Sequence, residues 1–371
     1  MATDLVETAS LPTHSLTAEE MIGEGNFRRE LERFFTRGWL FACHTAQLPQ
    51  IGDYLSGEMA GRRYFVIRTA DGVTAHYNVC PHRGSELVSE PSGNCGRTVT
   101  CPYHAWSFRH QGDFAGAPFR PDNLEGANLG LQTLQTEVWN SLVFITFSPD
   151  PIASVSQQLE GVDLSPWRLD RTKVASVLEY DVAANWKILW ENALECYHCG
   201  PNHPELRKVA NIVRDGAQPN HLSAGEYDYR PTYPLLDGVV SSTLDGSYGC
   251  TRLLGGGIAP PAGQGFLQWH TSIFEIILPP DHAHIMTYSP LSPSRSRLRL
   301  LMLVDEDATE GVDYDLTHLN GLHQVVRSQD DVICTRVQRG MESGTYKPGP
   351  YNPAYEFQNQ NFVRLYRQVM A

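Results

Sequence analysis

The chain has 371 residues, of which 41% are hydrophobic and 19% charged, a composition typical of globular proteins and a length sufficient for two domains. Its formal net charge of −13, with 29 lysines and arginines against 42 acidic residues, argues against nucleic-acid binding through phosphate contacts. No run of about 18 apolar residues occurs, so no membrane-spanning helix is expected. The first residues lack the basic start and apolar core of a secretory signal, and a cytoplasmic protein is therefore predicted.

Residues 1–39 are expected to form a loose arm followed by a helix. The helical segment, residues 24–39, carries charges on one side and an apolar stripe on the other. The stripe consists of Phe27, Leu31, Phe34 and Phe35. We expect this helix to pack its stripe on the C-terminal domain.

Residues 40–150 show short β-like runs separated by Gly, Pro, Asn and Asp, which predicts a small all-β domain. The clearest runs are residues 61–69, 73–79, 97–108 and 138–147. The sequence Pro149-Asp150-Pro151 marks a boundary, and residues 151–371 mix helical and strand patterns. The predicted fold class is α+β.

Two tight loops in the β domain each contain one cysteine and one histidine. They are Cys80-Pro-His82 and Cys101-Pro-Tyr-His104. A zinc site usually combines a Cys-x₂₋₄-Cys pair with a His-x₃₋₅-His pair. One Cys and one His from each loop instead suit a Rieske [2Fe–2S] cluster, in which one iron takes both thiolates and the other takes both imidazoles. Zinc remains the alternative at this stage.

The other cysteines show no convincing pairing by spacing, and they are expected to be free thiols. They are Cys43, Cys95, Cys196, Cys199, Cys250 and Cys334. Cys196 and Cys199 form a C-x-x-C motif, but it lacks the βαβ context of a thioredoxin. Buried free thiols are therefore the favoured interpretation of this pair.

Residues 185–206 place one carboxylate, Glu195, beside two histidines, His198 and His203. The apolar spacing predicts a helix from Trp186, on which Glu195 and His198 share a face. Gly200-Pro201 is expected to break that helix and to fold His203 back beside His198. Two imidazoles and a distant carboxylate suit the facial triad of a non-haem Fe(II) oxygenase, although a structural histidine pair is the simpler alternative.

With both motifs present, the chain resembles the oxygenase component of the Rieske non-haem iron oxygenases. Within that family LECYHCGPNHP most resembles the carnitine, choline and betaine monooxygenases and demethylases, which act on quaternary ammonium compounds. The resemblance implies an all-β Rieske domain and a catalytic domain with a large antiparallel sheet flanked by helices. It also implies a homotrimer in which electrons pass from the cluster of one subunit to the iron of the next.

The resemblance assigns His198 and His203 as ligands of a mononuclear iron and Glu195 as a bridge toward a cluster histidine of the neighbouring subunit. Helical periodicity points to the third ligand, because Asp330 is the one charged member of an apolar stripe. The stripe comprises Val326, Asp330, Ile333, Cys334, Val337 and Met341. A carboxylate on a buried stripe is costly unless it is paired or bound to metal, although a helix N-terminal turn would also tolerate it. The family pattern also places the iron carboxylate at Asp330, preceded by Gln329 where the family commonly has Glu.

The implied activity is that of a monooxygenase that hydroxylates a C–H bond with O₂. No G-x-G-x-x-G follows a predicted strand, so electrons from NAD(P)H should arrive through a separate flavin and iron–sulfur reductase. Hydroxylation of an N-methyl carbon would then break a C–N bond. The alternatives are an oxygenase for aromatic or other non-cationic substrates and a Rieske electron carrier, for which residues 151–371 would be superfluous.

Substrate contacts are expected from residues 265–279, interpreted as a single strand. Alternation on that strand would place Trp269 and Glu275 on one face and Phe274 on the other. An aromatic face and a carboxylate suit a quaternary ammonium ion, which has no hydrogen to donate. Tyr227, Tyr229 and Tyr233 add aromatic rings upstream. Ordinary core packing is the alternative for each of these residues.

Overall fold

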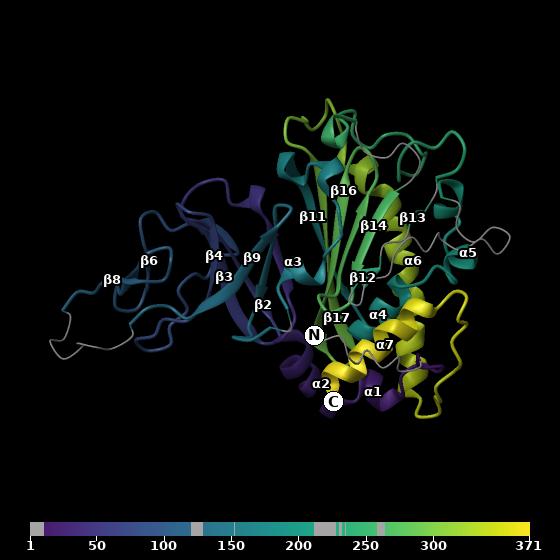
Figure 1. Ribbon diagram of the computed structural model, residues 1–371, viewed down its shortest axis with the longest axis horizontal. Helices are drawn as coiled ribbons and strands as arrows, with labels where there is room; N and C mark the ends of the chain where they lie inside the picture. The colour runs from purple at the N-terminus through teal and green to yellow at the C-terminus, as the bar shows by residue number, and fades with distance from the viewer. Residues whose placement is uncertain are drawn as a thin grey trace, which may run out of the picture.

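Two β-sheet units lie side by side along the long axis of the molecule in the computed structural model (Figure 1). The structure describes residues 11–119, 129–151, 153–210, 228–229, 232–233, 235–257 and 264–371. The N-terminal β unit occupies one end of the long axis, and a larger sheet covered by helices occupies the other. The predicted α+β class, with an all-β unit and a large antiparallel sheet, is confirmed.

The N-terminal β unit contains ten short strands among the described residues. They are β1 (Leu40–His44), β2 (Asp53–Met59), β3 (Arg62–Arg68), β4 (Val73–Tyr77), β5 (Ser92–Asn94), β6 (Val99–Thr100), β7 (Ser107–Phe108), β8 (Phe114–Gly116), β9 (Thr133–Trp139) and β10 (Leu142–Thr146). One antiparallel sheet has the order β1-β10-β9-β4-β3-β2-β5, and β6-β7-β8 form a smaller sheet at the outer end. The predicted run 138–147 is a hairpin, because Asn140 and Ser141 adopt positive φ angles of 48° and 64° and turn the chain between β9 and β10.

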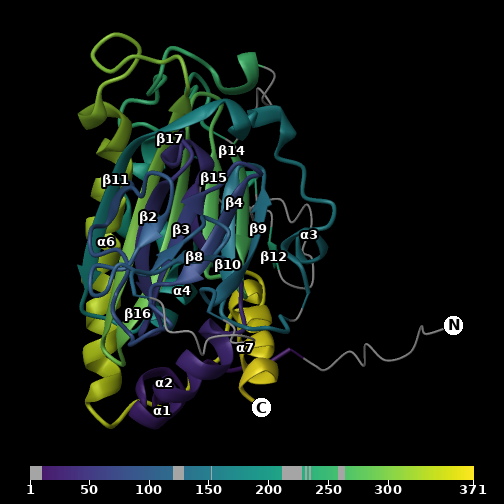
Figure 2. The ribbon, with the colours of Figure 1, turned by 90° about the vertical axis from the view of Figure 1, so that its left-hand side faces the viewer.

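The larger unit is built on an antiparallel sheet with the strand order β11-β17-β16-β15-β14-β12, and β13 also pairs with β14. Its strands are β11 (Thr172–Val182), β12 (Asp228–Tyr229), β13 (Thr232–Tyr233), β14 (Gln264–Trp269), β15 (Phe274–Leu278), β16 (Ala283–Ser292) and β17 (Arg295–Asp305). Figure 2 shows the N-terminal β unit lying in front of this sheet. Phe41 and Phe144 from that unit contact Phe274, and Phe144 also contacts Trp269, so one face of the large sheet is buried between the units.

Residues 265–279 do not form the single strand that the sequence predicted. They form the hairpin β14–β15, in which Trp269 pairs with Phe274 and Gln268 with Glu275. Directly paired residues share a face, so Trp269 and Phe274 lie together and Glu275 lies on the opposite face. The predicted face assignment was therefore wrong, because an unrecognised turn at residues 270–273 reversed the alternation.

Helices cover the other face of the large sheet (Figure 1). They include α4 (Trp186–Ala193), α5 (Cys199–Asn202), α6 (Leu316–Glu342) and α7 (Phe357–Met370), while the four-residue α3 (Val155–Gln158) follows the N-terminal β unit. Asp315 caps α6 by accepting from the backbone N–H groups of Thr317 and His318. None of the described helices is long and apolar enough to cross a bilayer.

The N-terminal arm leads into α1 (Ala18–Ile22), α2 (Glu24–Glu30) and a π-helical turn at Leu31–Phe35. Phe34 lies 5.2 Å from Trp186 of α4, ring centroid to ring centroid. Glu30 is fully buried and accepts from Trp186 Nε1 at 2.8 Å, Lys187 Nζ at 2.5 Å and Tyr366 Oη at 2.5 Å. These contacts attach the N-terminal helices to α4 and α7, because a buried carboxylate requires partners of this kind.

Candidate active site

The chain leaves helix α4 earlier than the sequence predicted. Helix α4 ends at Ala193, Glu195 lies in a turn, and a second short helix, α5, contains Gly200 and Pro201. Pro201 is tolerated there because the first turn of a helix needs no intrahelical N–H donor. The predicted break at Gly200-Pro201 was therefore wrong, although Glu195 and His198 still lie in contact.

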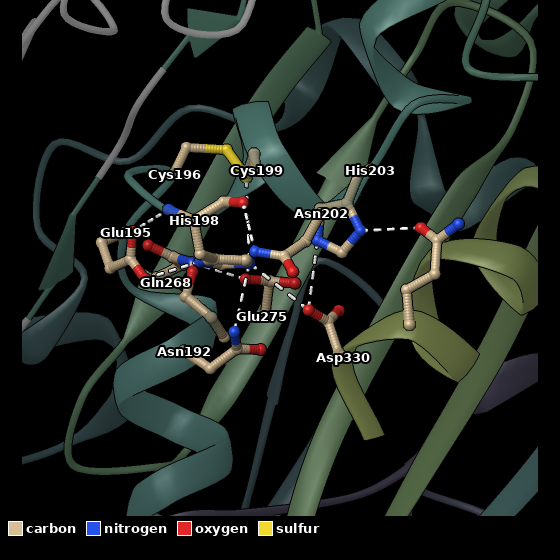
Figure 3. Close-up of a disulfide and its surroundings, with 12 residues drawn as sticks. Asn192, Glu195, Cys196, His198, Cys199, Asn202, His203, Gln268, Glu275 and Asp330 are labelled. Atoms are coloured by element: carbon tan, nitrogen blue, oxygen red, sulfur yellow. Dashed lines mark hydrogen bonds and ion pairs between the residues drawn. A yellow bond between two sulfur atoms is a disulfide. The ribbon is translucent and has the colours of Figure 1, made fainter. Parts of the chain in front are cut away.

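A disulfide between Cys196 and Cys199 encloses His198 (Figure 3). The prediction of two free thiols at these positions was wrong, because the turn between α4 and α5 brings their Cα atoms to 4.8 Å. The other cysteines are free. The disulfide links the residues on both sides of His198 and so restricts the position of this histidine.

His198, His203 and Asp330 come together between α5 and α6, as Figure 3 shows. Asp330 Oδ1 lies 3.3 Å from His198 Nε2 and 3.2 Å from His203 Nε2. Asp330 is 8% exposed and His203 1% exposed. The sequence predicted this grouping from residues more than 120 positions apart, and the structure brings all three into one buried cluster.

Hydrogen bonds fix the orientation of both imidazoles. His198 Nδ1 donates to Glu195 Oε1 at 2.6 Å, so Nε2 is the ring nitrogen available to a metal. His203 Nδ1 lies 2.8 Å from Gln329 Oε1, and the Gln329 amide nitrogen donates to Glu205 Oε2 at 2.7 Å. The bond to Glu205 fixes the amide orientation, so Gln329 accepts from His203 Nδ1 and His203 Nε2 is the ring nitrogen that faces Asp330.

Two imidazole Nε2 atoms and one carboxylate oxygen therefore face one another. Asp330 Oδ1 makes no hydrogen bond within the described residues. Metal–ligand bonds of about 2.1 Å at right angles would place neighbouring ligand atoms about 3.0 Å apart, close to the observed separations. The donor set and its geometry fit a mononuclear iron.

The electrostatics of this cluster also favour a positive charge at its centre. Burial lowers the pKa of His198, but the neighbouring carboxylates of Asp330 and Glu195 raise it by more, to about 9. Burial raises the pKa of Asp330, but the two histidines and Arg327 together hold it well below its ordinary value. The same carboxylates would stabilise a bound metal cation.

The four predicted Rieske residues lie in two matched loops beside β6 and β7. Cys80 N–H donates to Ser85 O at 2.8 Å, and Cys101 N–H donates to Trp106 O at 2.8 Å. Four residues beyond each cysteine, Gly84 and Ala105 have positive φ angles of 72° and 55°, which turn each loop back on itself. The two loops therefore share one backbone form and hold their side chains in a common space.

The side chains of these loops fit a two-iron cluster. Cys80 and Cys101 are buried and in hydrogen-bonding contact with each other, and the His82 and His104 rings lie 4.8 Å apart. His104 Nδ1 is buried without a hydrogen-bond partner in the described residues, as expected for a metal ligand. Trp106 stacks on His82 at 4.5 Å and holds that ring in place.

Comparison with known proteins identifies both units of the chain. Residues 38–135 match the model of the Rieske [2Fe–2S] domain, and residues 169–371 match that of the ring hydroxylating alpha subunit (catalytic domain). The second match alone covers more than half of the chain. The chain belongs to the Rieske non-haem iron oxygenases. The cofactors of this oxygenase are a Rieske [2Fe–2S] cluster and a mononuclear iron.

Two relatives and one solved structure place the oxygenase more closely. It is 32% identical to the glycine betaine monooxygenase oxygenase subunit of Pseudomonas aeruginosa (strain UCBPP-PA14), over 93% of this chain and 86% of the relative. It is 28% identical to the carnitine monooxygenase oxygenase subunit of Acinetobacter baumannii, over 86% and 83%. The quaternary ammonium Rieske monooxygenase CntA, crystallised with L-carnitine, shares its fold with a TM-score of 0.77 at 23% identity, over 96% of both chains.

A cavity between the large sheet and helix α6 adjoins His198, His203 and Asp330. Apart from the ligand residues, much of its wall is apolar, from Ile277, Met286, Leu298, Leu300, Leu322 and Val326. Polar side chains enter at several points, from Asn192, Glu195, Ser242, Glu275, His284, Tyr288, His323 and Arg327. The cavity thus combines an apolar body with buried ionisable groups.

Of the three predicted substrate contacts, Glu275 alone lines this cavity. Trp269 and Phe274 pack on the opposite face of the sheet against Phe144, so the prediction of these two as substrate contacts was wrong. Tyr227 lies outside the described residues, and the side chains of Tyr229 and Tyr233 are likewise not described. The hairpin turn between β14 and β15 explains why Glu275 and Trp269 separate.

Two functional neighbours were missed by the sequence interpretation. Gln329 orients His203, and Asn192 donates its amide N–H to His198 Nε2 at 3.1 Å. Gln329 had been given no role in ligation, although its position directly before Asp330 was a usable signal. Asn192 lies on α4, six residues before His198, and an asparagine at that distance from a metal-binding histidine is not part of the motif that the spacing predicts.

Gln329→Leu should weaken retention of the mononuclear iron about tenfold, because outer-shell partners of metal ligands typically contribute 10–100-fold. The change leaves the buried His203 Nδ1–H without its acceptor. Fe(II) titration of the apoprotein would measure the affinity, with Ser328→Ala as the control, since Ser328 bonds a carbonyl of its own helix. Unchanged affinity in Gln329→Leu would exclude this role.

Proposed function

We propose that this chain is the oxygenase component of a two-component monooxygenase that oxidises a carbon next to nitrogen in a small quaternary ammonium compound. The observation that carries the proposal is the convergence of His198, His203 and Asp330 on a cavity that also holds a buried carboxylate, Glu275. The relatives named above, which are glycine betaine and carnitine monooxygenase subunits, support the same class of substrate.

The proposed metal assignments follow the donor sets. Cys80 and Cys101 would bind one iron of the cluster, and His82 and His104 the other. His198, His203 and Asp330 would bind the mononuclear Fe(II), whose role when bound is to activate O₂ with electrons supplied through the Rieske cluster. The domain limits at residues 39 and 150 and the cytoplasmic location remain predictions.

The chain's own residues prepare this site for the reaction. Glu195 and Gln329 hold protons on the Nδ1 atoms, which directs both Nε2 lone pairs toward Asp330. The apolar wall excludes water and holds the carbon skeleton of the substrate. Hydroxylation of an N-methyl carbon inserts one oxygen atom of O₂ into its C–H bond, while the other oxygen atom takes two electrons from the reductase and two protons and leaves as water. The resulting cationic carbinolamine loses its hydroxyl proton and separates into formaldehyde and a tertiary amine.

Glu275 is the proposed partner of the substrate cation. It is 3% exposed, accepts from Gln268 Nε2 at 2.5 Å and forms no ion pair with any residue that the structure describes. Burial raises its pKa to about 7, although the bond from Gln268 lowers it. A bound cation would favour the ionised carboxylate and would add to the attraction that Arg327 already exerts on it.

A single chain does not bring its two metal centres together. Figure 1 shows β6, which directly precedes the Cys101 loop, and β8 at the end of the long axis opposite α5 and α6. His82 is exposed and Tyr103 is 55% exposed at that end, where a neighbouring subunit could cover them. We therefore propose a homotrimer with electron transfer between subunits and a separate flavin and iron–sulfur reductase that delivers electrons from NAD(P)H.

An oxygen-uptake screen tests the function directly. With NADH, NADPH and a reductase of this class, glycine betaine, carnitine or choline should stimulate O₂ uptake matched by formaldehyde or aldehyde release. Product mass spectrometry would locate the oxidised carbon. Turnover of neutral or anionic aromatic compounds, with no response to any ammonium compound, would instead support the alternative of an oxygenase for non-cationic substrates.

Glu275→Gln should raise KM for the cationic substrate about tenfold, which corresponds to the loss of about 1.4 kcal/mol of binding free energy. The amide keeps the size of the side chain but removes its charge. Glu191→Gln is the matched control, because Glu191 is another glutamate whose pKa burial raises to about 7, but it bonds Tyr351 away from the cavity. Equal KM values for Glu275→Gln and the unmodified enzyme would refute the role of Glu275.

A further inference from the structure

Three further histidines meet in the interior of the large unit, outside the proposed iron ligands. His282 lies in the turn before β16, His284 lies on β16, and His323 lies on α6. His282 and His284 are 0% exposed. Residues distant in the chain therefore bring three imidazoles into one buried group, which we call the histidine cluster.

The nitrogen atoms of the histidine cluster converge. One ring nitrogen from each residue lies within 4.8 Å of the other two. His284 Nδ1 and His323 Nε2 are 2.7 Å apart, and the His282 and His323 ring centroids are 6.1 Å apart. Ligand nitrogens around a tetrahedral ion with bonds of about 2.0–2.1 Å lie about 3.3 Å apart, so small side-chain rotations would suffice to bind one.

Asp281 orients one member of the histidine cluster. It accepts from Gly249 N–H at 2.7 Å and Cys250 N–H at 3.0 Å, and it also bonds the Ser241 hydroxyl. Burial raises the pKa of Asp281, but His282 and these hydrogen bonds lower it by more, so the carboxylate stays ionised. His282 Nδ1 lies 3.1 Å from this carboxylate and donates to it, as metal-binding histidines commonly do.

Two nitrogen atoms of the histidine cluster are buried without a hydrogen bond in the described part of the chain. They are His282 Nε2 and His284 Nε2. Leaving a buried polar atom unpaired costs about 1–3 kcal/mol, so such atoms usually have a partner.

We propose that His282, His284 and His323 bind a divalent transition-metal ion of the zinc class, in addition to the three irons of the oxygenase. Three imidazoles with a carboxylate behind one of them form a donor set that suits zinc and, among its analogues, cobalt. The proposal is independent of the substrate and of the iron assignment.

The proposed ion would lie at the far end of the active-site cavity. His284 and His323 line the same cavity as Asp330. His323 and Asp330 are seven residues apart on α6, which is about two turns or roughly 10 Å. A metal held here would have its remaining coordination position facing the cavity, where an oxygen of a bound molecule would reach it.

Metal stoichiometry of the complete protein tests the proposal. The holoenzyme, loaded to three irons per chain, is dialysed against Co²⁺ and separately against Zn²⁺, and metals are counted by mass spectrometry. We expect one added cobalt or zinc per chain, unchanged iron, and visible absorption typical of cobalt bound to nitrogen. Retention of all three irons shows that the new ion has not replaced the mononuclear iron.

Variants assign the added ion to the histidine cluster. His323→Gln and His282→Gln should each lower the affinity of the protein for the added ion at least about tenfold. Loss of an outer-shell partner alone typically lowers metal affinity 10–100-fold, and loss of a direct ligand should have an effect at least as large. His318→Gln is the control and should leave the affinity for the added ion unchanged. His318 is half-buried on the same helix and bonds Ser247 rather than the histidine cluster. Retention of the mononuclear iron, which is bound in the same unit, reports folding of each variant. Absence of added metal in the iron-loaded holoenzyme, or full uptake by a folded His282 or His323 variant, would overturn the proposal.

Discussion

Replacing Asp330 with alanine should remove the mononuclear iron and abolish turnover, while the Rieske absorption spectrum persists. Asp330 Oδ1 is the atom on which both histidine Nε2 atoms converge, at 3.2 and 3.3 Å. Loss of a direct ligand should exceed the 10–100-fold effect that is typical of outer-shell partners, so we expect more than about 100-fold lower activity. Iron per chain should fall from three to two.

Asp331→Ala provides the matched control for Asp330→Ala. Asp331 is the next residue on α6, but its carboxylate turns away from the ligands and pairs with Arg327 at 2.6 Å. This change should keep three irons per chain and cost stability rather than metal. If Asp331→Ala lost the iron and Asp330→Ala retained it, the ligand assignment would move by one residue and the helical-stripe argument would fail.

The stripe argument shows how far periodicity alone can locate a site residue. Asp330 is 8% exposed, as its place in an apolar stripe predicted. Val337 belongs to the same predicted stripe but is 45% exposed, and Arg327, which lies outside the stripe, is 6% exposed. Periodicity therefore identified the buried carboxylate. It could not show which part of α6 extends beyond the sheet, nor which of its polar residues are buried by neighbouring elements.

Local motifs were the most predictable part of the site. Each Rieske loop has its cysteine and histidine two or three residues apart, so the donor set can be recognised without knowing the fold. The histidine cluster lacks this property, because His323 comes from a helix 39 residues beyond His284. These residues come together only because α6 packs on β16, and the spacing of histidines in the sequence does not predict that contact.

The β14–β15 hairpin shows why strand faces were harder to predict. Its turn, at residues 270–273, contains neither Gly nor Pro, and Ile273 adopts a positive φ of 50° that its side chain does not favour. With no turn signal, the segment was interpreted as one strand. A chain reversal inside an alternating pattern moves the residues after the turn to the other face of the sheet. Glu275 therefore lines the cavity, whereas Trp269 does not.

Glu195→Gln should retain all three irons but slow electron transfer from the cluster to the mononuclear iron about 10- to 100-fold, the range typical of outer-shell partners. Glu195 Oε1 accepts from His198 Nδ1 at 2.6 Å, and Oε2 accepts from the His198 backbone N–H at 3.0 Å. The amide keeps the shape of the side chain but removes the charge that polarises this imidazole. If Glu195 also contacts a cluster histidine of the neighbouring subunit, the same change weakens the link between the two centres.

Single-turnover kinetics separate this role from a structural one. The reduced cluster is mixed with O₂ and substrate, and its oxidation is followed by absorbance, so slower oxidation with full iron content supports the bridge. Glu191→Gln, four residues earlier and bonded to Tyr351, should oxidise at the unmodified rate. Cluster oxidation at the unmodified rate in Glu195→Gln would show that Glu195 only orients His198, and electron transfer between subunits would then have to use another contact.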